Sequence, residues 1–214
     1  MSTNMRLWIA AVLMLMIGVS ERAQADVLYS TFGPGDSFNT SQGLTVSGAT
    51  TMSGYNADAN QFSVTTNATL NTIELALFVF SANDSVAVEL TADNAGRPGA
   101  VLESYTLISL PFVPAKIITI DSTVHTELVA GDFYWLAVVP LTDTTAGGWN
   151  DNSIGAQGLT IQSSDAAFLT GTPGFFSTGQ SAFRITGVVP EPASLALLAT
   201  GLTGLMFSRR RKPA

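Results

Sequence analysis

The chain has 214 residues, a formal net charge of −7, no cysteine and a single histidine. The absence of cysteine excludes disulfides, thiol catalysis and thiolate metal sites. Between residues 26 and 189, three basic residues stand against 14 carboxylates, so this segment has a net charge of −11. A field of that sign repels nucleic acid and anionic lipid, which makes both poor partners for it.

The first 25 residues have the layout of a secretory signal peptide. Arg6 precedes an uncharged stretch from Leu7 to Val19, and a small-x-small cleavage site follows at Ala23 and Ala25. An uncleaved membrane helix is the alternative, but 13 uncharged residues fall short of the ~20 that a spanning helix needs. We therefore expect a signal helix over residues 1–25 and a mature chain that begins at Asp26.

Residues 26–189 predict one all-β domain. Alternating apolar residues and frequent turn residues indicate strands at 73–80, 86–91, 101–107, 116–120, 133–139 and 183–189. The run 133–139 is apolar on both faces, which predicts a central strand. We expect a hairpin turn at Ser81–Asp84 and a further turn at Asp93–Gly99. About nine or ten strands at this spacing favour an antiparallel β-sandwich of jelly-roll type, with a sheet closed on itself as the alternative.

The last 25 residues predict an export anchor. Pro190, Glu191 and Pro192 lead into an uncharged segment, 193–208, and the cations Arg209, Arg210, Arg211 and Lys212 follow. The prolines keep the entry to this segment extended, and the cations favour the cytoplasmic side of a membrane. The 17 uncharged residues from 192 to 208 span ~25 Å as a helix, against a hydrocarbon core of ~30 Å. So short a membrane helix suits a transient handle that is later removed.

This tail resembles the PEP-CTERM sorting signal of Gram-negative bacteria. The resemblance implies recognition by an exosortase-type enzyme, processing at Pro190, Glu191 and Pro192, and Arg209, Arg210, Arg211 and Lys212 as the cytoplasmic basic stop. It also implies transient membrane attachment and a final location at the cell surface or in the extracellular matrix. The segments Asp93–Leu102 and Leu128–Pro140 resemble the β-rich surface domains called choice-of-anchor proteins, which implies architecture and location but no activity.

The sequence offers little chemistry, so we predict a protein that is not an enzyme and has no catalytic residues. His125, the only histidine, cannot build a histidine zinc site alone, and no Gly-x-Ser-x-Gly motif supplies a nucleophile for it. We expect it in an exposed loop. Asp143 and Asp151 flank a glycine-rich stretch and are weak calcium candidates, with solvated turn residues as the alternative. No other metal or cofactor is expected.

We expect an exported, non-enzymatic surface or matrix protein, with exopolysaccharide as a candidate partner. Two other functions stay open. The first is a carbohydrate-binding module, because loop aromatics can stack on sugar rings; the candidates are Tyr55, Trp149, Phe175 and Phe176. Capping of the core is the alternative role for these aromatics. The second is a secreted glycoside hydrolase, which needs two carboxylates ~5–9 Å apart among the 14 available.

Overall fold

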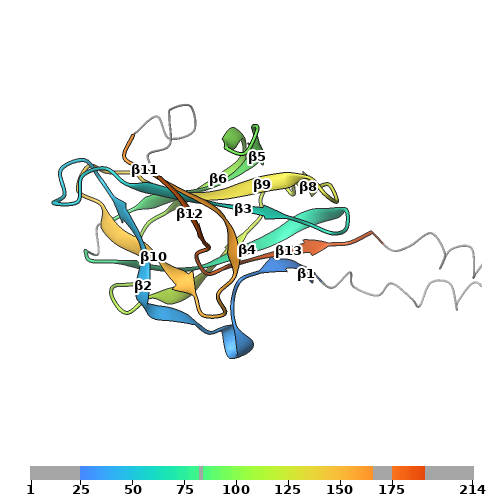
Figure 1. Cartoon of the computed structure of the whole chain (residues 1–214), viewed down its shortest axis with the longest axis horizontal. Coiled ribbons are helices and arrows are strands. Elements are labelled where there is room, and N and C mark those ends of the chain that lie inside the picture. The colour runs from blue at the N-terminus through green and yellow to red at the C-terminus, as the bar shows by residue number, and fades with distance from the viewer. Residues whose placement is uncertain (1–24, 82–83, 166–174, 191–214) are drawn as a thin grey trace, which may run out of the picture.

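The computed structural model describes residues 25–81, 84–165 and 175–190, which form two antiparallel sheets packed face to face (Figure 1). This confirms the predicted all-β antiparallel sandwich. The one helical element within these residues is a short 3-10 helix, η1 (Pro34–Asp36), and no helix in them has the length and apolar character to span a membrane. The predicted signal helix, apart from Ala25, and the predicted membrane helix at 193–208 lie outside the described residues.

The first sheet has seven strands. Five follow the order β1-β13-β4-β10-β2, and β7 and β8 also pair with β4. Their bounds are β1 (Asp26–Ser30), β2 (Phe38–Ser47), β4 (Ala68–Val79), β7 (Lys116–Asp121), β8 (Glu127–Leu128), β10 (Ala146–Asn152) and β13 (Phe183–Val188).

The second sheet has six strands in the order β12-β11-β3-β9-β5-β6. Their bounds are β3 (Ala57–Ser63), β5 (Val86–Asp93), β6 (Pro98–Leu107), β9 (Phe133–Pro140), β11 (Gln157–Ser163) and β12 (Phe175–Gly179). Strand β9 lies between β3 and β5, so the prediction of a central strand at 133–139 is confirmed.

Eight of the strands pair in the order of a jelly roll. They form the run β2-β10-β4-β7 in the first sheet and β3-β9-β5-β6 in the second. The chain changes sheets at each connection from β2 to β5. This order agrees with the predicted jelly-roll type, in which two Greek keys wrap around one core.

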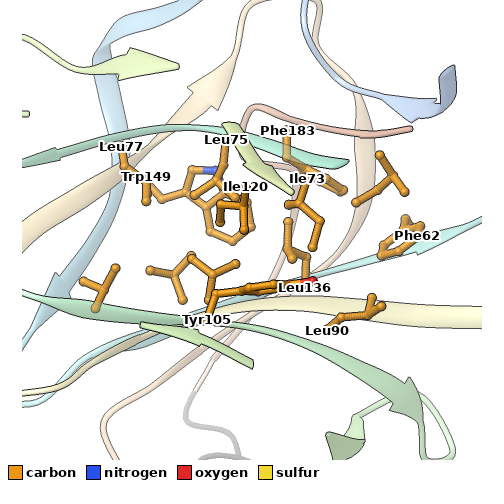
Figure 2. Close-up of a cluster of buried hydrophobic side chains, with 14 of the residues drawn as sticks. Phe62, Ile73, Leu75, Leu77, Leu90, Tyr105, Ile120, Leu136, Trp149 and Phe183 are labelled. Atoms are coloured by element: carbon orange, nitrogen blue, oxygen red, sulfur yellow. The ribbon is translucent and has the colours of Figure 1, made fainter. Parts of the chain in front are cut away.

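The main core fills the space between the sheets (Figure 2). Alternate residues of β4 point into it, namely Ile73, Leu75, Leu77 and Val79, which is the apolar face that the sequence predicted. Across the core they meet side chains of the second sheet, among them Phe62, Leu90, Tyr105 and Leu136. A smaller apolar cluster covers the other face of β9 through Trp135 and Ala137. Burial on both faces explains why β9 is apolar throughout.

The two predicted turns have different outcomes. Asp93–Gly99 does connect two paired strands, β5 and β6, and Asp93 Oδ2 accepts a hydrogen bond of 3.0 Å from the Gly96 N–H. The hairpin predicted at Ser81–Asp84 is wrong, because β4 and β5 lie in different sheets and do not pair. The alternating pattern shows which face of a strand is buried, and it carries no information on the neighbouring strand.

Several strands were not predicted, among them β2, β3, β10 and β11. Strand β10 shows the reason, since its sequence Ala-Gly-Gly-Trp-Asn-Asp-Asn resembles a turn. The glycines are required by close packing: a Cβ on Gly147 would lie 2.4 Å from the Phe78 carbonyl oxygen, and one on Gly148 would lie 2.8 Å from the Phe78 ring. Neighbouring strands therefore select residues that a sequence pattern assigns to loops.

Candidate functional site

The chain leaves the sandwich directly at the predicted sorting signal. Strand β13 ends at Val188, and the exposed Pro190 follows after one further residue. Up to that point the strand is fixed on both sides, because Gly187 pairs with Asp26 of β1 and Val188 with Thr69 of β4. A proline has no N–H to continue a ladder, so pairing stops where the signal begins.

The two predicted processing points lie at one end of the sandwich. The predicted cleavage site at Ala25 precedes β1, and Asp26 is the register partner of Gly187 three residues before Pro190 (Figure 1). The rest of both signals lies outside the described residues: Ala23 at the first point, Glu191 and Pro192 at the second, and the basic stop Arg209, Arg210, Arg211 and Lys212. The folded domain is therefore bounded by the β1–β13 pair.

Trp149, predicted as a ligand-binding loop aromatic, is a core residue instead. It lies in β10 with no exposed surface, and its indole N–H donates a hydrogen bond of 2.9 Å to the Ala182 carbonyl oxygen. Its ring meets Phe183 edge to face, with centroids 5.8 Å apart (Figure 2). The ligand-contact role is therefore wrong for Trp149, and its alternative role in the core is correct, because the small glycines beside it let β10 pack as an interior strand.

The other predicted aromatics differ in setting. Phe175 and Phe176 belong to β12, where their backbones pair with Gln162 and Ile161, so they are strand residues and not loop residues. Their side chains lie outside what the structure describes. Tyr55 does lie in a connection, before β3, and is partly exposed.

The Tyr55 hydroxyl lies in acidic surroundings. Burial raises its pKa above the ordinary value, and the charges of Glu89 and Asp165 raise it further. Burial likewise raises the pKa of Glu89, whose Oε2 is buried without a hydrogen-bond partner. This corner therefore combines a neutral phenol, which can donate a hydrogen bond, with carboxylates.

The two calcium candidates do not share a site. Asp143 precedes β10 and is exposed, whereas Asp151 lies near the other end of that strand. An extended chain rises ~3.3 Å per residue, so Ala146 and Asp151 lie about 16 Å apart along β10. Asp143 lies beyond the Ala146 end, where its carbonyl oxygen accepts a hydrogen bond from the Thr50 N–H. A calcium ion holds its ligands at ~2.3–2.6 Å and cannot bridge that gap. No cluster of three or more histidine, aspartate or glutamate side chains arranged for a metal occurs within the described residues.

The surroundings of His125 give no catalytic arrangement. The residue is exposed, as predicted, with a positive φ of 58°. Its backbone N–H donates to Ser122 Oγ at 2.8 Å, and that hydroxyl donates to the Glu103 carboxylate at 3.0 Å. Since Ser122 gives its proton to Glu103 directly, the histidine ring is not placed between them as a triad requires.

Glu103 instead holds the loop between β7 and β8 against the sandwich. Its carboxylate accepts hydrogen bonds from the Thr126 N–H at 2.8 Å, from Ser122 Oγ and from the Tyr105 hydroxyl. Burial alone would raise the pKa of Glu103, but these donors outweigh it and the pKa lies below the ordinary value. The same carboxylate helps to raise the pKa of Tyr105 to about 12, after burial.

A buried polar group that the sequence analysis missed lies on the inner face of β3. Asp58 and Asn60 alternate with alanines there, and they share this face with the core residue Phe62. Asp58 has no exposed surface, and burial raises the pKa of its carboxyl group well above the ordinary value, although the Gln162 side chain acts in the opposite direction. The sequence signal was the alternation itself, but polar residues in such a pattern are expected to face solvent.

Residues 188–212 match the family model for the PEP-CTERM protein-sorting motif. The match confirms the resemblance of the tail and begins at the last residue of β13. Comparison with curated proteins gives no match. The resemblance of the middle region to choice-of-anchor domains stays a prediction.

Proposed function

We propose that this chain, which carries a PEP-CTERM protein-sorting motif at residues 188–212, delivers its β-sandwich to the outside of a Gram-negative cell. An exosortase-type enzyme recognises the motif, and the chain is processed near Pro190, Glu191 and Pro192. The sandwich then stays at the cell surface or in the extracellular matrix. The observation that carries this proposal is the position of the motif, which starts where the fold ends.

The fold supports processing at this point. Strand β13 pairs with β1 on one side as far as Gly187 and with β4 on the other side as far as Val188. Removal of the chain beyond Pro190 breaks none of these ladders, so the sandwich loses no strand when the tail is removed. The exposed Pro190 also offers an enzyme an extended segment that is not paired with the sheet.

A binding or coating role, without catalysis, fits the side chains of the described residues. The His125, Ser122 and Glu103 group fixes a loop, and the buried Asp58 is inaccessible to a substrate. Exopolysaccharide is the partner that we propose. Neutral sugar polymers are not repelled by a domain with a net charge of −11, whereas nucleic acid and anionic lipid are.

Mass spectrometry of surface-located protein tests the sorting proposal. We expect a C-terminus near Pro190–Pro192 in cells with an active exosortase, and loss of this form in a Glu191→Ala variant. Asp143→Ala is the matched control, because Asp143 is an exposed carboxylate in the connection before β10, at the opposite end of the sandwich from the motif. Surface protein that still ends in Lys212-Pro213-Ala214 would refute processing.

Carbohydrate binding at Tyr55 is the second candidate, because this aromatic is partly exposed and the charges of Glu89 and Asp165 act on its hydroxyl. An aromatic face beside hydrogen-bonding groups suits a sugar ring. In a pull-down with purified exopolysaccharide, we expect Tyr55→Ala to weaken binding and Phe133→Ala, an exposed aromatic in β9, to leave it unchanged. Equal binding by both variants would remove Tyr55 from consideration. No described pair of carboxylates favours the glycoside hydrolase.

A further inference from the structure

Phe80 is an exposed aromatic residue directly after β4. Leu77 and Val79 point into the core, so Phe78 and Phe80 lie on the outer face of the first sheet. Phe80 keeps 59% of its surface exposed, whereas Phe78 is partly buried. Since Phe80 contributes little to the core, its ring is available to a partner.

Neighbouring residues hold the Phe80 ring in place. Its backbone N–H donates a hydrogen bond of 2.8 Å to the Ala146 carbonyl oxygen, which continues the pairing of β4 with β10. The rings of Phe78 and Phe80 meet edge to face, with centroids 5.2 Å apart. Phe78 in turn packs against Gly148, where a Cβ would lie 2.8 Å from the ring. The sheet therefore presents a supported aromatic ring with an open surface.

Hydrogen-bonding side chains lie beside this ring. The turn Thr142–Thr145 immediately precedes Ala146, the backbone partner of Phe80. Thr145 Oγ1 fixes the turn by donating a bond of 3.0 Å to the Ser85 carbonyl oxygen. The exposed residues of the turn are Thr142, Asp143 and Thr144. An aromatic ring next to hydroxyls and a carboxylate is a combination that suits a sugar, whose rings have apolar faces and whose edges carry hydroxyls.

The ring lies at the end of the sandwich opposite the sorting motif. Thr69 of β4 pairs with Val188, where the motif begins. Phe80 comes eleven residues after Thr69, and a strand rises ~3.3 Å per residue, so Phe80 lies about 36 Å farther along the strand. In a membrane-held precursor this end points away from the membrane, toward the surrounding matrix.

The exposed aromatic area is small for contact with a second copy of the chain. Phe112 is the bridge partner of Val79 and is 62% exposed. A phenylalanine has ~200 Å² of surface, so Phe80 and Phe112 together expose about 240 Å². A stable protein interface buries ~800 Å² of each partner. Copies held by one membrane also present this end in the same direction, so they do not face each other through it.

We propose that Phe80 is a stacking platform for a neutral polysaccharide, with the side chains of Thr142, Asp143 and Thr144 bonding to its hydroxyls. The Asp143 carboxylate and the net charge of −11 disfavour a polymer that carries carboxylates or phosphates. This contact rests on the proposed function, for which it supplies a polysaccharide-binding surface, and it is separate from the Tyr55 candidate.

Co-sedimentation of the full chain in detergent micelles tests the site. The probe is exopolysaccharide from the producing strain, divided by anion exchange into a neutral and an acidic fraction. We expect Phe80→Ala to weaken binding to the neutral fraction roughly tenfold, since one aromatic contact is lost, and Phe80→Trp to keep it. Phe133→Ala is the matched control, because Phe133 is 53% exposed and begins β9, at the other end of that strand from the turn.

Phe80→Leu separates stacking from a general apolar contact, because leucine is apolar and has no flat ring. We expect it to bind as weakly as Phe80→Ala, with both variants folded by circular dichroism. Equal binding by Phe80→Leu and the unchanged protein would overturn stacking, and tighter binding of the acidic fraction would overturn the neutral class. Sedimentation velocity without polysaccharide should show the same oligomeric state for Phe80→Ala and the unchanged protein; a dimer lost in the variant would assign the surface to a second copy.

Two failures of binding have different meanings. If Phe80→Ala binds as well as the unchanged protein, the Phe80 site is wrong and exopolysaccharide remains the proposed partner. If the unchanged protein binds neither fraction, both the site and the exopolysaccharide partner are wrong. The sorting proposal depends on neither result, because the mass of the processed protein tests it separately.

Discussion

Truncation of Trp149 separates a core role from a ligand-binding role. Trp149→Ala removes the largest side chain that β10 contributes to the core, along with its hydrogen bond to Ala182 and its contact with Phe183. Replacing a fully buried large aromatic by alanine costs about 3–5 kcal/mol of stability. For a domain of this size, about 1 kcal/mol lowers the melting temperature by roughly 2–4 °C, so we expect a loss of about 6–20 °C.

Trp149→Phe divides this loss into its parts. An aromatic ring remains, but it is smaller than the indole and cannot donate to the Ala182 carbonyl. We expect the lost bond and the smaller buried area to lower the free energy of unfolding by about 1–2 kcal/mol. Urea unfolding followed by far-ultraviolet circular dichroism measures both variants without relying on tryptophan fluorescence. Phe133→Ala, at an exposed position, should change stability by at most about 0.5 kcal/mol.

The reasoning fails if Trp149→Ala unfolds at the same urea concentration as the unchanged protein. It would also fail if that variant kept its stability and lost binding to polysaccharide, since that outcome describes an exposed ligand contact.

Three further changes test other parts of the fold. The folded state keeps the Asp58 proton to higher pH than the unfolded chain does, so the free energy of unfolding falls as the pH rises above about 4. Asp58→Asn should make this fall shallower in urea titrations at several pH values. Glu103→Gln should lower the free energy of unfolding by about 1–2 kcal/mol at pH 7, because the Glu103 carboxylate accepts hydrogen bonds from the Thr126 N–H and two hydroxyls. Folding lowers the pKa of Glu103, so the difference in stability between the variant and the unchanged protein should vanish as the pH falls below about 4. Gly147→Ala should cost about 1–3 kcal/mol or more in thermal unfolding, because its Cβ meets the Phe78 carbonyl oxygen at 2.4 Å, while Gly179→Ala, which meets nothing within 4 Å, should be neutral.

The position of the sorting motif distinguishes the two ends of the sandwich. The start of β1 and the end of β13 are register partners, so both predicted signals leave from one end of the sandwich (Figure 1). The connections after β2, β4 and β9 lie at the opposite end, since Ser47 pairs with Ala146 and Gly147 with Val79. A membrane-held precursor would therefore present those connections outward.

Local sequence was sufficient for the strands with regular alternation. The inward face of β4, the central place of β9 and the turn at Asp93–Gly99 were all predicted, because period-two burial and turn chemistry are properties of neighbouring residues. The sorting motif at the tail was likewise readable, since it consists of a short proline motif, an uncharged run and a basic block in series.

Only the tertiary structure decided which strands pair and which side chains are buried. The chain changes sheets between β4 and β5, so the expected hairpin is absent, and Trp149 enters the core because glycines let its strand pack closely between β2 and β4. Asp58 has the pattern of a solvent-facing residue, yet it lies on the inner face of the second sheet, where the first sheet covers it. Alternation along a strand fixes two faces, and which of them meets another sheet depends on contacts between residues far apart in the chain.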